Sequence, residues 1–472
     1  MDKKWWTLIA VCTGMFMLLL DVTIVMVVQP TIQRGLGASL SDVQWVVDAY
    51  ALTLASLLLT AGVLADRYGR RRLFQIGLVI FTLGSLLCGT AQDPLMLVLS
   101  RAAQGVGGAI MFPVSLALLG NSFRGKDRGT AFGAWGAIGG IAVALGPVLG
   151  GVIATEWSWR GIFLVNVPVG ILASAVTYWK VDESRSPHPV PPDWAGFATL
   201  TAGLVSLVYG LIRAGERSWS DVGVIVCLVL AAVFLASFIL SERRVAHPMF
   251  DLSLLRVPTF TGGAIAAFAM NGSLYSMLLY LVLYLQDGLG YSALGAGLRI
   301  AVISGCTLVT AVIAGRLTER VPTRWLIGPG LALVGVGLVL MVGVTRSWTH
   351  LIPGFIVAGL GAGMVNPPLA STAIGVVPPA QAGMASGGNT TFRQIGIATG
   401  IAAYGSLYRS RGLDDLFWIA AAVAFTGAVC ALALIRSRDF VRREPSAPAP
   451  APASARPTAA QPRPNAGQPR SM

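Results

Sequence analysis

The chain has few charged residues for its length. Asp, Glu, Lys and Arg make up 12% of its 472 residues, whereas 55% are hydrophobic and the mean hydropathy is +0.71. A soluble domain cannot bury that proportion of apolar surface, so the bilayer is the expected solvent. The shortage of charge therefore excludes an ordinary soluble enzyme.

Cysteine and histidine are also scarce. The five cysteines all lie inside apolar runs, which argues against a disulfide framework or a metal cluster: Cys12, Cys88, Cys227, Cys306 and Cys430. The three histidines fall in connections between those runs, which excludes a buried histidine relay. No nucleotide-binding loop and no sizeable extramembrane domain is present in the sequence. We therefore expect no metal site, no cofactor and no enzymatic activity.

The net charge of +13 comes mainly from arginine, since only four of the 34 basic residues are lysine. The basic residues separate the apolar runs and do not cluster on one face or in one tail. That distribution argues against a nucleic-acid partner.

Long apolar runs dominate the chain. A spanning helix needs roughly 20 apolar residues. The expected spans lie at about 7–28, 46–65, 73–92, 95–118, 132–154, 162–180, 194–213, 221–241, 259–285, 294–315, 325–345, 350–374, 385–408 and 417–436. The first run is too long for a signal-peptide core and contains Asp21, so we interpret it as a retained helix.

Basic residues indicate the orientation, since Lys and Arg collect in cytoplasmic loops. With a cytoplasmic N-terminus, 24 of the 34 basic residues fall in the cytoplasm, seven on the other side and three within helices. The sequence predicts a multi-pass protein of the bacterial cytoplasmic membrane with both termini in the cytoplasm.

Two stretches recur along the chain. The segment G-V-L-A-D-R-Y-G-R-R-R-L starts at Gly62, and G-R-L-T-E-R-V-P-T-R-W-L starts at Gly315, 253 residues later. A Gly-rich stretch from Gln104 is matched 254 residues later, from Ala358. The matching offsets indicate a duplicated six-helix unit; chance similarity between Gly-rich helices is the alternative.

The repeat predicts the domain organisation. Residues 1–180 and 259–440 would form two six-helix bundles, and residues 181–258 would add two inserted helices with their linkers. Residues 441–472 are rich in Pro and Ala, which predicts a disordered cytoplasmic tail.

Several motifs resemble the major facilitator superfamily, and in particular its 14-helix drug:proton antiporter family. They are the segment from Gly62 to Leu73, Arg101-Ala-Ala-Gln-Gly105, Gly146-Pro-Val-Leu-Gly-Gly151, Leu20-Asp-Val-Thr23 and Trp157-Ser-Trp-Arg-Gly-Ile-Phe-Leu-Val-Asn-Val-Pro-Val-Gly170. The chain departs from the family at Ala142, where glycine is usual, and at Met26 and Gln29, where asparagine and an apolar residue are usual. The resemblance implies an all-α transporter with 14 transmembrane helices that works by alternating access.

Intramembrane charges are the candidates for proton coupling. Asp21 lies about seven residues from the outer end of its helix, and Arg101 lies at a similar depth in another. A charge there costs at least ~2.5–3.5 kcal/mol, so we expect the two side chains to approach each other. A purely structural ion pair is the alternative. Asp48, between Trp45 and Tyr50, is a second candidate, or else an interfacial carboxylate.

The resemblance implies a cytoplasmic gate formed by Gly62, Asp66, Arg67, Gly69, Arg70 and Arg71. A charge cluster that serves only membrane insertion is the alternative. Asp66 could face the N-terminus of a neighbouring helix, such as the one starting near Ala385. The resemblance also implies an antiporter motif of small residues and a bend, formed by Gly139, Gly146, Pro147, Gly150 and Gly151.

A substrate cavity is expected between the bundles, lined by Met26, Gln29, Gln104, Asn271, Tyr275 and Arg393. Arg393 lies about eight residues from the inner end of its helix, so snorkelling to the cytoplasm is its alternative. Tyr280, Tyr284 and Gln286 are further cavity candidates, or else membrane-interface residues.

These features predict a monomeric, proton-driven exporter of amphipathic drugs, antibiotics or lipophilic cations. Its partners would be small-molecule substrates, protons and the lipid bilayer. Two alternatives remain: a dedicated exporter of one endogenous antibiotic or metabolite, and an uptake permease for nutrients.

Overall fold

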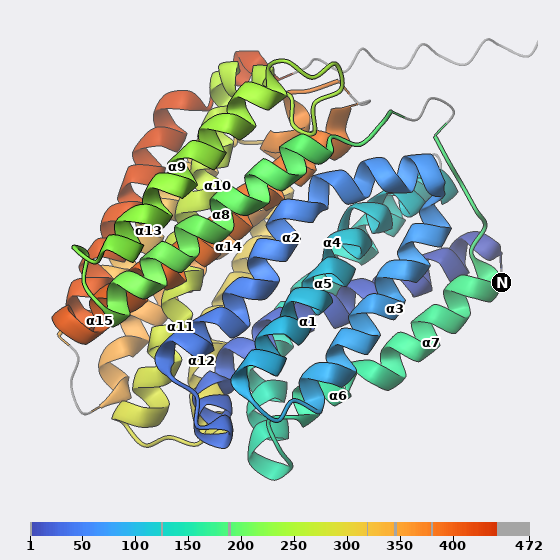
Figure 1. Cartoon of the computed structure of the whole chain (residues 1–472). Helices are drawn as coiled ribbons and strands as arrows, with labels where there is room; N and C mark the ends of the chain where they lie inside the picture. The colour runs from blue at the N-terminus through green and yellow to red at the C-terminus, as the bar shows by residue number, and fades with distance from the viewer. Residues whose placement is uncertain are drawn as a thin grey trace, which may run out of the picture. The chain divides into compact units, whose positions relative to one another are not determined.

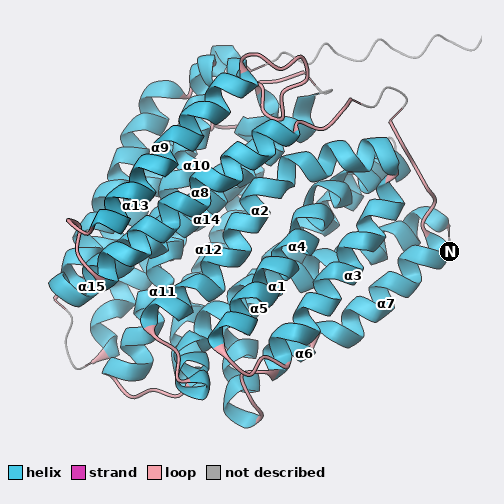
Figure 2. Ribbon diagram, viewed as in Figure 1, coloured by secondary structure: helices cyan, strands magenta, loops and turns pink. Residues whose placement is uncertain are grey.

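The computed structural model describes residues 2–123, 126–186, 190–318, 320–343, 347–378 and 381–440, and every regular element in these ranges is helical (Figure 1, Figure 2). Twelve helical segments there are long and apolar enough to cross a bilayer. Two other predicted spans also form helices. One has only 16 residues (α13, Arg324–Val339), and the other is the polar first part of α15, which begins at Ala382. The expected all-helical, polytopic fold is confirmed.

The first half of the chain folds as antiparallel helices joined by short turns. They are α1 (Lys3–Leu36), α2 (Leu40–Tyr68), α3 (Arg70–Gly89), α4 (Pro94–Ser122), α5 (Lys126–Glu156), α6 (Gly161–Leu164) and α7 (Asn166–Lys180). Local sequence sets these boundaries. Gly37, with φ of 60°, ends α1, and Ser39 with Asp42 forms a capping box that begins α2.

The second half contains less regular helices. They are α8 (Trp194–Glu216), α9 (Val222–Glu242), α10 (Pro258–Met270), α11 (Ser276–Leu283), α12 (Ala293–Leu317), α13, α14 (Ile352–Gly375) and α15 (Ala382–Leu434). Two π-helical segments, η2 (Asn271–Tyr275) and η3 (Tyr284–Gly288), continue α10 and α11 into one span. Gly412, with φ of 78°, breaks α15 into its two parts.

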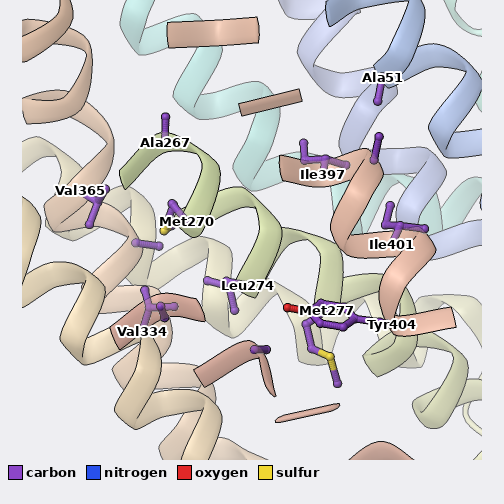
Figure 3. Close-up of a cluster of buried hydrophobic side chains, with 14 of the residues drawn as sticks. Ala51, Ala267, Met270, Leu274, Met277, Val334, Val365, Ile397, Ile401 and Tyr404 are labelled. Atoms are coloured by element: carbon purple, nitrogen blue, oxygen red, sulfur yellow. The ribbon is translucent and has the colours of Figure 1, made fainter. Parts of the chain in front are cut away.

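Each half packs mainly against itself. In the first, α1 packs on α5 and α7, and α4 packs on α2 and α3. In the second, α15 packs on α10 and α13, and α14 packs on α12 and α13. Apolar side chains from α10, η2, α11, α13, α14 and α15 form one buried cluster, which Ala51 of α2 also joins (Figure 3).

The halves meet along two helix pairs, α5 with α12 and α2 with α15. Helix α8 packs between α9 and these last two helices, so α8 and α9 add to the side of the assembly (Figure 1). The predicted bounds of the two bundles and the insertion stay a prediction. Residues 441–472, predicted to be disordered, lie outside the described residues.

The described helices have a basic end and an opposite end. We call the basic end the one where α1 begins and α2 meets α3, with Lys3, Lys4, Arg67 and Arg70–Arg72. The opposite end is where α1 meets α2 and where α5 ends. These two names give positions within the fold only.

Candidate functional site

A buried ion pair joins α1 to α4. Arg101 Nη1 donates to Asp21 Oδ2 at 2.6 Å, and both side chains are at most 2% exposed. The expected approach of these two residues is therefore present in the structure. Arg101 also donates from Nε to the carbonyl of Val46 at 3.1 Å, and its guanidinium lies 4.3 Å from the centre of the Tyr50 ring.

Amide side chains complete the surroundings of Asp21. Gln104 Nε2 donates to Asp21 Oδ1 at 2.9 Å, and Asn166 Nδ2 donates to the same oxygen at 3.1 Å. Both amides also donate to Ser85 Oγ, at 2.7 and 3.2 Å. The network spans α1, α3, α4 and α7, so a change in the charge of Asp21 affects four helices at once.

Sequence reasoning assigned Gln104 to the cavity and missed Asn166 and Ser85. Gln104 follows Arg101 by three residues, which puts both on one face of α4. It therefore shares the ion pair and lies away from the cavity. Asn166 begins α7, where a polar residue inside an apolar run was the available signal.

The central cavity lies between the two halves and has a volume of about 190 Å³. Of the predicted lining residues, Met26, Asn271, Tyr275 and Arg393 are present. The rest of its wall is mainly apolar and includes Leu18, Leu19, Val22, Phe112, Val143 and Ile300. A concave apolar site with few polar groups is the usual form of a small-molecule binding site.

Arg393 and Gln29, both predicted to line the cavity, differ in their positions. The Arg393 side chain lines the cavity instead of reaching the basic end. Gln29 lies outside the cavity wall and is fully buried, because its helix turns that face toward protein.

The small residues of α5 permit close packing on two helices. A Cβ added at Gly139, Gly146 or Gly150 would meet α1, at 3.0 Å from Leu19 Cδ1, 1.9 Å from Thr23 Oγ1 and 3.1 Å from the Ile24 carbonyl, respectively. At Gly151 it would lie 2.6 Å from Leu294 Cα in α12. Pro147 lies in the same stretch and lines the cavity. The motif thus seals α5 against α1 and against the other half.

Contacts close the opposite end of the cavity. Gln286 of η3 donates to the Val27 carbonyl at 2.7 Å and accepts from Arg34 at 3.3 Å. Gln44 of α2 donates to Tyr280 Oη at 2.9 Å and to the Ile401 carbonyl at 3.1 Å. Gln286 and Tyr280 therefore join the two halves, and both are buried.

Three glycines of α5 and α12 face away from other protein atoms. Gly133 and Gly136 of α5 and Gly305 of α12 are exposed, and a Cβ added at any of them would meet no atom within 4 Å. In the described residues the halves are thus joined at the opposite end by hydrogen bonds, and α2 and α15 stay in contact toward the basic end as far as Leu59 and Gly387.

The α2–α3 turn at the basic end is held by its own half. Asp66 pairs with Arg70 at 2.8 Å, and Arg71 donates to the Tyr178 carbonyl at 2.6 Å. Glu183 accepts from the backbone N–H groups of Arg71 and Arg72, at 3.0 and 3.1 Å, which caps α3. This contact requires glycine at position 69, where φ is 115° and an added Cβ would lie 2.7 Å from the Glu183 carboxylate.

The remaining gate candidates, Arg67 and Gly62, are also at this end. Arg67 stacks on Tyr68, and Gly62 faces Pro113 of α4. The suggested contact of Asp66 with the helix that starts near Ala385 is not made in the described residues. Its carboxylate pairs with Arg70 of its own half instead.

Asp48 is a buried carboxylate at the junction of the halves. Its side chain is 0% exposed, and neither oxygen has a hydrogen-bond partner among the described residues. The same is true of the Gln29 amide. The interfacial alternative for Asp48 is therefore wrong, because the carboxylate does not reach the surface.

We expect the free energy of unfolding of Asp48→Asn to lie within about 1 kcal/mol of the wild-type value, because no ion pair is lost and the side chain keeps its shape. Asp21→Asn should be clearly less stable, since it leaves Arg101 without its counter-charge. Thermal unfolding of both purified variants in detergent measures the difference. An equal loss of stability in the two variants would contradict this prediction.

Together, two packed helical halves, a central cavity and a buried ion pair define a membrane transport protein. The model of the Major Facilitator Superfamily matches residues 11–306 and again residues 262–467. The chain belongs to this superfamily.

Its similar proteins include drug-resistance and export proteins. It is 37% identical to the multidrug resistance protein Stp of Mycobacterium tuberculosis over 403 residues, which cover 85% of this chain and 75% of that protein. It is 34% identical to the probable actinorhodin transporter of Streptomyces coelicolor, over 86% of this chain and 72% of that one. It is 35% identical to the puromycin resistance protein of Streptomyces alboniger, over 85% of this chain and 81% of that protein.

A solved structure shares the fold. The human organic anion transporter MFSD10 superposes with a TM-score of 0.65 at 16% identity, covering 91% of this chain and all of that one. At this identity the likeness concerns the fold alone.

Proposed function

We propose that the protein exports amphipathic small molecules from the bacterial cytoplasm in exchange for protons. The resistance and export proteins among its relatives support efflux as the direction of transport. The excess of basic residues at the basic end supports a cytoplasmic location for that end. With this orientation, the end joined by Gln44 and Gln286 would face outward.

The observation that carries proton coupling is the Asp21–Arg101 pair. An intramembrane carboxylate with one charged partner can change its charge when that partner moves. Protonation of Asp21 would weaken its contact with Arg101 and loosen four helices together. Asp48 is the second candidate to carry a proton.

Alternating access follows from the two halves. Residues 1–180 and 259–440 would rock as two bundles around the cavity within a single monomer, and residues 181–258 would be carried along. Closing the basic end would bring Asp66 and the arginines of the α2–α3 turn against the other half. Gly133 and Gly136, beyond the contact of Gly140 with Leu308, leave room for α5 to approach its neighbours at that end.

Proton release from everted membrane vesicles tests the proposal. With an acidic interior, an added substrate should trigger proton efflux in the wild type, and Asp21→Asn should abolish it. Asp182→Asn is the matched control, because Asp182 is an exposed carboxylate paired with Lys3 at the surface. Normal substrate-triggered release by Asp21→Asn would refute a role for Asp21 in coupling.

A further inference from the structure

The central cavity contains one charged side chain, that of Arg393. Its polar companions in the wall are neutral: Thr23, Asn271, Tyr275, Ser304, Thr390 and Gln394. Among the described residues, no aspartate, glutamate or lysine lines the cavity. The wall therefore has a positive charge and no negative one.

The charge of Arg393 has no counter-charge in the part of the chain that the structure describes. Within the described residues no carboxylate oxygen lies within 4.0 Å of its guanidinium. Its hydrogen bond is a long one, from Nη2 to the Asn366 carbonyl at 3.5 Å. Arginine in the membrane interior is costly unless a counter-charge or water accompanies it. An anion in the cavity would supply that counter-charge.

The intramembrane carboxylates are not available to a ligand in this cavity. Asp21 is held by Arg101, Gln104 and Asn166. Asp48 is fully buried outside the cavity wall. A lipophilic cation would thus meet the guanidinium with no facing carboxylate, and it would be repelled.

The neutral side chains near Arg393 suit an oxyanion with an aromatic body. Tyr275 Oη accepts from Asn366 at 3.3 Å, and Asn271 lies one helical turn before Tyr275 on the same π-helical segment. Phe112 and the aliphatic wall provide an apolar surface for the rest of a molecule. A guanidinium is well suited to a carboxylate, sulfonate or phenolate, because it offers parallel donors.

We propose that the cavity selects amphipathic organic anions over cations of the same size, with Arg393 as the residue that determines specificity. This inference rests on the proposed export function and names the class of its substrate. Neutral molecules with an electron-rich oxygen would bind with intermediate affinity.

Three naphthalene probes of similar size isolate the effect of charge: 2-naphthoate, 2-naphthamide and (2-naphthylmethyl)trimethylammonium. Calorimetric titration of the purified full chain in detergent, with a detergent blank, measures their binding. We expect wild type to bind naphthoate at least about tenfold more tightly than the ammonium compound, since a hydrogen-bonded charge pair contributes that much or more.

Variants at Arg393 test the residue itself. Arg393→Gln should remove the preference for naphthoate, and Arg393→Lys should retain part of it. Arg217→Gln makes the same charge change at an exposed loop residue and should leave the preference intact. Equal or tighter binding of the ammonium compound by wild type would overturn the inference, as would absent naphthoate binding or a preference that survives Arg393→Gln. If Arg393→Gln does not fold, the three probes on wild type still decide.

The vesicle experiment separates this inference from the proposed function. Selective binding of naphthoate without any substrate-triggered proton release would leave the cavity's specificity intact and refute antiport. Proton release triggered by cations alone would support antiport and refute the anion site.

Discussion

Replacing Arg101 with methionine should cost about 3–5 kcal/mol of folding free energy, the usual penalty for removing one partner of a buried ion pair. Asp21 would keep its bonds from Gln104 and Asn166 but lose its counter-charge. The Val46 carbonyl and the Gln104 side-chain oxygen would lose their donor as well. Thermal unfolding in detergent and the yield of folded protein measure the loss.

A second variant separates folding from transport. Asp21→Asn combined with Arg101→Met removes both charges and keeps an acceptor oxygen for the two amides, so most of the stability should return. This double variant should nevertheless fail to couple protons to substrate. Arg213→Met is the control, because Arg213 pairs with Asp221 at 2.9 Å where the side chains are 32% and 26% exposed. Its loss should cost less than about 1 kcal/mol. Comparable losses at Arg101 and Arg213 would contradict this account of the buried pair.

The fold was predictable because the bilayer imposes one simple rule. Apolar runs of sufficient length must form helices that satisfy their own backbone, so composition and length located the spans. Helix α13 and the first part of α15 are the least typical, since one is short and the other contains the polar stretch from Asn389 to Gln394. Both still formed helices because packing within the bundle supports them.

The ion pair was also predictable, whereas its full network was not. Two intramembrane charges at similar depth have few other partners, so Asp21 and Arg101 could be matched from sequence. Ser85 and Asn166 belong to the Asp21 network because α3 and α7 are rotated so that these side chains face it. Helix packing sets that rotation, and the sequence alone does not reveal it. The sequence also left two positions open for the Arg393 side chain, the cavity and the cytoplasmic surface. Depth along α15 allowed snorkelling, and only the position of neighbouring helices directs its side chain into the cavity.

The π-helical segment η2 shows a local signal that sequence reasoning did not use. Asn271-Gly272-Ser273 interrupts an apolar run, and glycine weakens a regular helix at that point. The freed backbone is partnered across the bundle, since Tyr404 donates to the Gly272 carbonyl at 2.6 Å. This arrangement lets both Asn271 and Tyr275 line the cavity.

Gly297→Val should stop transport by preventing closure of the opposite end. A Cβ at position 297 would lie 2.2 Å from the carbonyl oxygen of Pro147, a backbone atom of α5 in the other half. Overpacking of this kind costs about 1–3 kcal/mol, and more where the obstacle cannot rotate away. Because the clash lies between the halves and not within one, each half should keep its own core. The result is a shift of the population toward conformations open at the opposite end.

Accessibility of the cavity from the opposite end measures that shift. A cysteine introduced at Thr23, which lines the cavity, is labelled with a membrane-impermeant maleimide in a chain whose native cysteines are replaced. In the Gly297→Val variant, this cysteine should react with the maleimide faster than in the parent chain when the reagent is added from that side. The variant should also lose substrate-triggered proton release. Gly305→Val adds the same side chain two turns along α12, where no atom lies within 4 Å, so it should not increase labelling from that side. Wild-type transport by Gly297→Val, or equal labelling of the two variants, would mean that the α5–α12 contact is not the seal of the opposite end.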